Sequence, residues 1–176
     1  QANTVLVFRN MEALTAQDED LLRTFSDMHH MDIWLQPKGP DTVHAFYPTT
    51  ENLYYDLPEF GVRMPYRPTD FTQVNFHINR VLVGRAVRLL DVQPHERVAD
   101  FFCGLGNFTL PLVTRAAHVI GVEGSTQLNE RALQNAVVNQ LENKTEFHSQ
   151  NLFEATADGL RALGKIDKYL VDPPRE

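Results

Sequence analysis

The stretch "VADFFCGLGNFTLPL", residues 98–112, contains the residues of this chain that are best suited to chemistry. Gly104 and Gly106 follow a strand-like run and precede a helix-like one, and glycines there let a ligand approach the backbone closely. The same turn holds Cys103, the only cysteine. Its thiol is a nucleophile, a metal ligand or a bystander. Because a plain tight turn remains an alternative for the glycines, other residues must decide.

Glu123 is the second candidate, because it ends the strand-like run "VIGVE", 17 residues after Gly106. A carboxylate there can accept hydrogen bonds from both hydroxyls of a ribose. Dinucleotides and S-adenosylmethionine both use such an arrangement. A dinucleotide site needs a third glycine where this chain has Thr109, since a pyrophosphate lies at the start of the helix. The turn therefore favours S-adenosylmethionine, with Asp100 facing its ammonium group. An acid that caps the next helix is the alternative for Glu123.

Two further candidates stand at later strand ends. Asn151, in "HSQNLFE", is placed to reach an adenine ring or else to make a local Asx turn. Asp172, in "VDPPR", precedes two prolines that fix an extended backbone. A methyltransferase places its acceptor base at such a position, whereas the simpler explanation is an abrupt end of the strand.

A parallel sheet is needed to bring these residues together. Strand-like and helix-like runs alternate from residue 97, with strands expected at 97–102, 118–123, near 145–149 and at 168–172. This spacing predicts right-handed βαβ units in a doubly wound α/β sheet. Ligands bind outside the carboxyl ends of the strands in such a sheet.

The part before residue 97 is expected to hold a long helix and a small α+β unit. A helix of about 17 residues is predicted from apolar residues on one face, namely Val74, Ile78, Val81, Leu82, Ala86 and Leu89. Shorter strand-like runs surround one helix near residues 18–30, and "RPTDF" (67–71) marks a boundary. We expect an α+β domain at 1–69 and a cofactor-binding domain at 70–176.

Composition and charge limit the function. The chain has 43% hydrophobic and 22% charged residues and no apolar run that could cross a membrane, so we expect a cytoplasmic globular protein. Its net charge is −7, with 5 basic and 11 acidic residues in positions 1–70, a poor match for a polyanion. No HxxxH, HExxH, GxSxG or GKS/T motif occurs, so we expect no zinc site and neither hydrolase nor NTPase activity.

Several segments, taken in order, resemble the RNA (uracil-5)-methyltransferases, most closely the members that act on 23S rRNA. They are "DFTQVN" (70–75), "DVQPHERVADFFCGLGNFTLPL" (91–112), "VIGVEGS" (119–125), "QNAVVN" (134–139), "NLFE" (151–154) and "VDPPR" (171–175). The resemblance implies a Rossmann-like S-adenosylmethionine-dependent methyltransferase fold, truncated after its fourth strand, and 5-methyluridine formation in 23S rRNA. It places the cofactor contacts at Gln73, Phe102, Asn107, Glu123, Asn151 and Asp172.

The resemblance also implies what this chain lacks. Enzymes of this family add a cysteine thiolate to uracil C6, and a glutamate base later removes the C5 proton. Both residues would follow Glu176, so no catalytic residue is assigned and Cys103 is a bystander. The related 23S rRNA enzymes also carry an RNA-binding barrel and an iron–sulfur cluster, which would precede Gln1. We therefore expect a fragment that binds the cofactor but binds RNA weakly or not at all.

Three alternatives remain open. A sister enzyme that methylates uracil in tRNA would share the same segments. An amino-group methyltransferase would use the proline motif to hold an exocyclic amine, although Arg175 stands where those enzymes have an aromatic residue. A non-catalytic Rossmann-like domain, binding a protein partner through its acidic first part, is the third.

Overall fold

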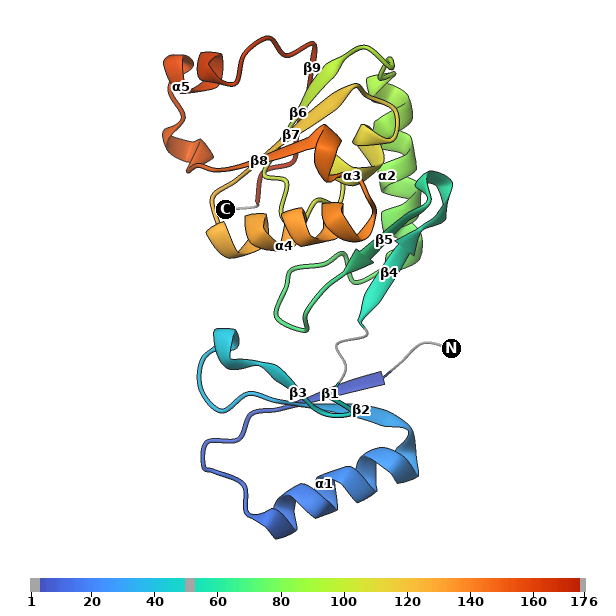
Figure 1. Cartoon of the computed structure of the whole chain (residues 1–176), viewed down its shortest axis with the longest axis vertical. Helices are drawn as coiled ribbons and strands as arrows, with labels where there is room; N and C mark the ends of the chain where they lie inside the picture. Colours follow the sequence, from blue (N-terminus) through green and yellow to red (C-terminus); the bar gives the residue numbers. More distant parts are fainter. Residues whose placement is uncertain (1–3, 50–52, 175–176) are drawn as a thin grey trace. The chain divides into compact units, whose positions relative to one another are not determined.

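The computed structural model describes residues 4–49 and 53–174, and its contacts divide the chain into two compact units (Figure 1). The first unit consists of Gln1–Leu53 and Arg67–Asp70, and the second of Tyr54–Tyr66 and Phe71–Glu176. Every candidate cofactor residue named above falls in the second unit.

A three-stranded sheet and one helix form the first unit. The strands, in the spatial order β1-β2-β3, are β1 (Thr4–Phe8), β2 (Met31–Leu35) and β3 (His44–Tyr47). Strand β1 is parallel to β2, β3 is antiparallel to it, and the short 3-10 turn η1 (Pro40–Thr42) precedes β3. Helix α1 (Ala16–His29) packs on the sheet, and a capping box between Thr15 and Asp18 holds its first turn (Figure 1). This is the small α+β unit that the sequence predicts.

A four-stranded parallel sheet forms the centre of the second unit. Its strands, in the spatial order β8-β7-β6-β9, are β6 (Arg97–Phe101), β7 (His118–Glu123), β8 (Thr145–Ser149) and β9 (Lys168–Val171). The chain passes outward from β6 to β7 and β8 and then returns to the other side of β6. The doubly wound α/β prediction is therefore confirmed. A reversal of this kind leaves a crevice at the carboxyl ends of the strands, beside the turn after β6.

Helices cover both faces of this sheet. They are α2 (Phe76–Leu90), α3 (Thr109–Val113), α4 (Thr126–Val138) and α5 (Ala157–Ala162), with 3-10 turns η3 (Glu142–Lys144) and η4 (Leu152–Glu154). Val98 of β6 shares one buried cluster with Val83 of α2 and Leu110 of α3. The next residue, Ala99, belongs to a second cluster together with Leu160 of α5, as alternation along a strand requires. Within the described residues, no helix has the length and apolar character to cross a bilayer.

A two-stranded antiparallel hairpin, β4 (Tyr54–Leu57) and β5 (Val62–Pro65), joins the core of the second unit, with the 3-10 turn η2 (Pro58–Phe60) between its strands. Its alternate residues are at most 6% exposed and share the cluster of α2 and α3: Tyr55, Leu57, Val62 and Met64. The sequence analysis placed these residues in a domain at 1–69. That boundary differs from the division by contacts, because one whole face of the hairpin is buried against α2 and α3 of the second unit.

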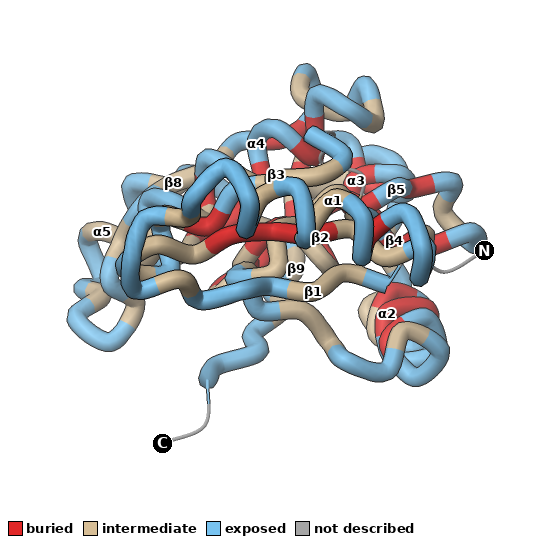
Figure 2. Tube along the Cα trace, turned by 90° about the horizontal axis from the view of Figure 1, so that it is seen from below, coloured by how far each residue is buried: buried red, intermediate tan, exposed pale blue. Residues whose placement is uncertain are grey.

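Helix α2 turns a different face to the core from the one that its apolar spacing indicates. Ile78, Val81 and Leu89 are 56%, 53% and 75% exposed, whereas Val83 and Val87 are buried. Figure 2 shows both buried and exposed residues along α2. The helix carries a second apolar row at helical spacing, and the hairpin and α3 cover that row. Packing partners, rather than the helix itself, therefore select the buried face.

Candidate functional site

The turn after β6 holds its backbone in an unusual conformation. Phe102, Gly104 and Gly106 all have positive φ, at 63°, 55° and 93°. A positive φ is unfavourable for a residue with a bulky side chain and is concentrated at functional sites. The amides of Phe102 and Cys103 both donate to the carbonyl of Val122 on β7, at 2.9 and 3.2 Å, and these bonds hold the turn against the neighbouring strand.

A cleft opens at this turn, and four of the six expected cofactor residues line it. Gln73 comes from the loop before α2, Phe102 and Asn107 from the turn, and Asp172 from the end of β9. The remaining lining residues are Tyr55, Phe71, Thr72, Cys103, Gly104, Leu105 and Phe108. No heavy atom lies within 4 Å of the place where a Cβ on Gly104 would stand. The backbone is therefore open to a ligand at this point.

Glu123 joins the turn after β6 to the turn after β7. One carboxylate oxygen accepts from the Gly104 amide at 3.1 Å and the other from the Ser125 amide at 3.0 Å. Glu123 is half-buried and does not line the cleft itself. The bond to Ser125, the N-cap of α4, is the helix-capping role that the sequence left open. Each oxygen keeps acceptor capacity for a ligand, because a carboxylate oxygen has two lone pairs.

Asn151 lies apart from the cleft in this structure. It is exposed, and its side-chain oxygen accepts from the Phe153 amide at 3.1 Å, the local turn that the sequence analysis gave as the alternative. The ring of Phe153, however, lies 5.4 Å from that of Phe102 in the turn. The segment after β8 therefore reaches the rim of the site through an aromatic contact.

Asp100 is buried beneath the turn rather than lining the cleft. It is 1% exposed, and one of its oxygens accepts from the Thr109 hydroxyl at 2.6 Å. Its Oδ1 has no hydrogen-bond partner among the described residues. Burial, together with the charges of Asp172 and Glu123, raises the pKa of Asp100 to about 7. The expectation that this carboxylate faces a ligand is not met, because Thr109 and the core enclose it.

Cys103 is poorly placed to act as a nucleophile. Its side chain is 4% exposed, and its sulfur lies 4.0 Å from the Asn129 side-chain oxygen. A Cβ on Gly121 would come within 2.9 Å of that sulfur, so the glycine makes room for it. Burial raises the pKa of the thiol strongly, and the carboxylates of Asp100 and Glu123 act in the same direction. A thiol that does not ionise is a weak nucleophile.

Sequence reasoning missed two residues of the site, Tyr55 and Asn79, which both bond to Asn107. Asn107 Oδ1 accepts from the Tyr55 hydroxyl at 2.8 Å and from Asn79 Nδ2 at 2.9 Å, and Asn107 Nδ2 donates to Asn79 Oδ1 at 3.0 Å. These three residues come from β4, α2 and the turn. No local pattern signals such a network, because its members are 24 and 28 residues apart.

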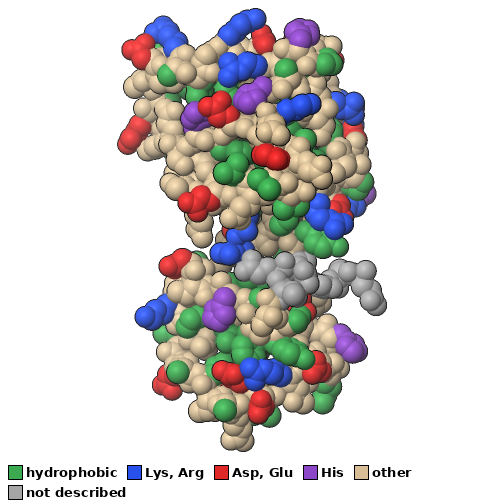
Figure 3. Space-filling model, in the orientation of Figure 1, with side chains coloured by type: hydrophobic (Ala, Val, Ile, Leu, Met, Phe, Trp, Pro, Cys, Tyr) green, Lys and Arg blue, Asp and Glu red, His purple; other side chains and the backbone are tan. Residues whose placement is uncertain are grey.

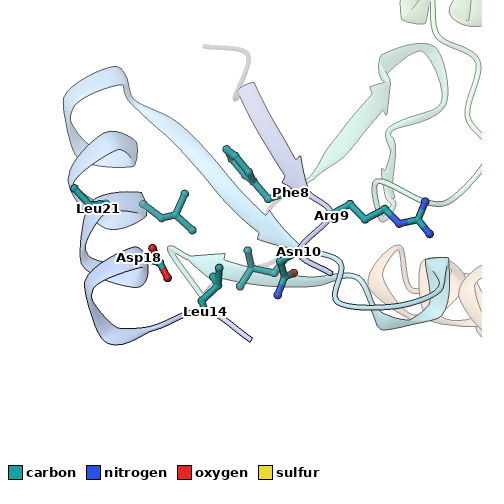
Figure 4. A pocket seen from close by; sticks show the side chains of 8 residues that line it. Phe8, Arg9, Asn10, Leu14, Asp18 and Leu21 are labelled. Carbon is teal, nitrogen blue, oxygen red and sulfur yellow. The ribbon is translucent and has the colours of Figure 1, made fainter. Parts of the chain in front are cut away.

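A larger cleft, of about 330 Å³ against about 80 Å³ at the turn, lies within the first unit (Figure 4). Its lining is mostly apolar and comes from Phe8, Arg9, Asn10, Leu14, Asp18, Leu21, Leu22 and Leu35. None of the expected site residues lies there. Across residues 4–49 and 53–174, no group of three or more His, Cys, Asp or Glu side chains is arranged to hold a metal ion.

Comparison with known proteins gives the family. The family model described as "tRNA (Uracil-5-)-methyltransferase" matches residues 4–175. The 23S rRNA (uracil(1939)-C(5))-methyltransferase RlmD of Cupriavidus pinatubonensis is 62% identical over 98% of this chain and 37% of its own length. The protein of the same name from Ralstonia pickettii is 60% identical over 98% of this chain and 38% of its own length. The chain thus spans less than two fifths of these relatives.

The fold has a counterpart among solved structures. A Pyrococcus abyssi tRNA (uracil-54, C5)-methyltransferase in complex with S-adenosyl-L-homocysteine superposes with a TM-score of 0.70 at 20% identity, covering 97% of this chain and 40% of that one. At this identity the likeness shows the fold alone, which is the Rossmann-like fold of the methyltransferases. Since the family model covers almost the whole sequence, the chain belongs to the tRNA (uracil-5-)-methyltransferase family.

Proposed function

We propose that this chain binds S-adenosyl-L-methionine in the cleft at the turn after β6. We further propose that it is the cofactor-binding part of a cytoplasmic enzyme that methylates uracil C5 in 23S rRNA to give 5-methyluridine. The observation that carries the proposal is the convergence of Gln73, Phe102, Asn107 and Asp172 on one cleft. The 62% identity to a 23S rRNA enzyme favours that substrate over tRNA.

The residues present suit the groups of an S-adenosyl compound. Phe102 offers an aromatic face for adenine or ribose, and Gly104 leaves the backbone free for close approach. Glu123 retains acceptor capacity for two ribose hydroxyls beside the Gly104 amide. Gln73 and Asn151 complete the proposed set, and Phe153, two residues after Asn151, packs on Phe102.

The cofactor supplies a methyl group on a positively charged sulfur, and the residues of this chain bind and orient it. Asp172 lines the cleft with a carboxylate that favours a cationic ligand. Cys103 takes no part as a nucleophile, because its thiol is buried and its pKa is raised. We therefore propose that the chain alone does not turn over and that the nucleophilic cysteine and the base belong to residues after Glu176.

We propose that RNA binding by this chain alone is weak. Net charge is −7, and Lys and Arg side chains are scattered among Asp and Glu on the face drawn in Figure 3. Affinity for RNA depends largely on basic side chains that neutralise phosphates. A single cysteine, Cys103, cannot supply the ligands of an iron–sulfur cluster.

Calorimetric titration of the chain with S-adenosylhomocysteine tests the proposal. We expect micromolar binding, and we expect Glu123→Ala to weaken it by about 100-fold, because two hydrogen bonds to a charged acceptor are lost. Glu130→Ala, which removes an exposed glutamate of α4, is the matched control and should bind as the parent chain does.

Two outcomes would count against the proposal. One is a folded chain that does not bind S-adenosylhomocysteine at all. The other is a Glu123→Ala variant that binds as tightly as the Glu130→Ala control. A separate assay with 23S rRNA and labelled S-adenosylmethionine tests turnover, and incorporation of methyl groups by this chain alone would contradict the assignment of the catalytic residues to a later segment.

A further inference from the structure

The hydrogen bonds of Asn107 leave it only one role toward a ligand. Its side-chain oxygen already accepts from the Tyr55 hydroxyl and from Asn79 Nδ2, which uses both lone pairs. Its nitrogen donates one hydrogen to Asn79 Oδ1 at 3.0 Å and has one hydrogen left. Asn107 can therefore act on a ligand in the cleft only as a hydrogen-bond donor.

Tyr55 has the opposite hydrogen-bonding role toward a ligand. Its single hydroxyl hydrogen is given to Asn107, so its oxygen can only accept from a ligand. The tyrosine is 6% exposed, and its ring packs 5.3 Å from that of Phe76 and 6.0 Å from that of Tyr66. Because the ring is held on two sides, the hydroxyl position is set by packing as well as by its hydrogen bond.

Asn79 completes the network through its side-chain amide. It is 1% exposed on α2, and its amide pairs reciprocally with that of Asn107. A reciprocal pair couples the two amides, so Asn107 cannot turn over unless Asn79 turns over with it. A buried amide left without its partner is costly, so the pairing persists when the cleft is open.

Tyr55 and Asn107 both line the cleft, and they present an acceptor and a donor there together with the carboxylate of Asp172. The amino-acid end of S-adenosylmethionine carries an ammonium group, which only donates, and a carboxylate, which only accepts. The strand order of the sheet is consistent with placing this end of the ligand near Asp172. Glu123, the proposed ribose acceptor, follows β7, whereas Asp172 follows β9 on the other side of β6.

We propose that the network of Tyr55, Asn79 and Asn107 recognises the amino-acid end of the S-adenosyl cofactor, with Asn79 as the positioning residue. Tyr55 accepts from the ammonium group and Asn107 donates to the carboxylate, while Asn79 holds the Asn107 amide in the orientation that this requires. The inference rests on the proposed cofactor function and specifies which part of the cleft takes which part of the ligand.

Two ligands separate this role from a structural one. S-Adenosylhomocysteine has the amino-acid end, and 5′-methylthioadenosine lacks it. We expect Asn79→Ala and Tyr55→Phe to weaken binding of S-adenosylhomocysteine by about 10- to 100-fold, the usual loss for hydrogen bonds to charged groups, and to change binding of methylthioadenosine less than about twofold. Binding of methylthioadenosine also reports whether each variant keeps a folded cleft.

Tyr66→Phe is the matched control, because it removes a hydroxyl from the same aromatic cluster but outside the network. It should bind both ligands as the parent chain does. Equal weakening of both ligands by Asn79→Ala and Tyr55→Phe, or weakening of neither, would overturn the inference while leaving the cofactor assignment in place. A parent chain that binds neither ligand would overturn the proposed function itself, and this inference with it.

Discussion

The cleft of the first unit and the cleft at the turn after β6 differ in a way that their volumes do not show. The cleft of the first unit is the larger of this pair, and four of its eight lining residues are leucines, from α1, the loop before it and β2. The smaller cleft at the turn after β6 gathers polar side chains from four separate segments, over a backbone with positive φ at Phe102 and Gly104. The proposed binding site therefore rests on convergent polar groups and an unusual backbone and not on volume.

The carboxyl groups of the two regions differ as well. Asp18, at the first cleft, is exposed, and hydrogen bonds from Thr15 lower its pKa. Asp100, behind the second cleft, is buried, and its pKa is raised to about 7. The first unit therefore gains stability when Asp18 ionises, whereas the second unit loses stability when Asp100 ionises.

The largest expected effect is the pH dependence of the second unit. Folded Asp100 keeps its proton up to about pH 7, whereas the unfolded chain loses it near its ordinary pKa of 3.8. Stability should therefore fall as pH rises between these values, by at most ~1.4 kcal/mol per pH unit, and level off above pH 7. Urea unfolding of the parent chain and of Asp100→Asn, followed by far-UV circular dichroism, measures this, and the variant should show a flatter profile.

The first unit serves as the internal control for that experiment. Its stability should instead decline as pH falls below the ordinary pKa of Asp18, 3.8, toward the lowered pKa of the folded unit, because Asp18 stabilises that unit only while it is ionised. Trp34 is the only tryptophan and is buried in this unit, so its fluorescence follows the first unit alone. Identical pH profiles for Trp34 fluorescence and circular dichroism would refute the contrast between the two carboxyl groups.

The next effect concerns ligand binding at the turn. Gly104→Leu should weaken binding of S-adenosylhomocysteine by about 100-fold, because a side chain would fill the open backbone of the cleft. Gly61→Leu is the matched control, since Gly61 also has a positive φ, 65°, and open space at its Cβ position, but lies outside the cleft. Equal losses in both variants would attribute the effect to backbone strain instead.

The smallest expected effect is a loss of stability confined to the first unit. Leu22→Ala removes a half-buried side chain from the first cleft and should lower the stability of the first unit by about 1–2 kcal/mol. Binding of S-adenosylhomocysteine should not change, because the proposed site lies wholly in the second unit. Trp34 fluorescence in urea measures the first quantity and calorimetry the second. Reduced cofactor affinity in Leu22→Ala would show that the larger cleft contributes to the site after all.

Much of the second unit was predictable, because its elements follow from local patterns. The alternation of apolar strands and helices from residue 97 predicted β6, β7, β8 and β9 in a parallel sheet, and that sheet is present. The hairpin strand β4 and the buried face of α2 were not predicted. Both depend on contacts between segments distant in sequence, and helix α2 carries two apolar rows between which its own sequence does not choose.

The candidate site likewise has residues that the sequence predicted and residues that it did not. Glycines after a strand and an acid after the next strand are local signals, and they led to Gly104 and Glu123. Tyr55 and Asn79 carry no such signal, because a buried tyrosine or asparagine acquires a role only from the group it meets. The enclosed position of Asp100 was also hidden, since a carboxyl next to a glycine turn can lie on either side of the strand.

Sequence alone determined the fold class, the position of the glycine turn and the family, because periodicity, glycine placement and motif order are properties of the chain itself. Tertiary structure alone decided which face of α2 is covered, which expected residues share a cleft, and how Asn79 and Tyr55 orient Asn107. The physical reason is that burial and hydrogen-bond saturation belong to sets of groups brought together from distant positions, and no local pattern records which groups will meet.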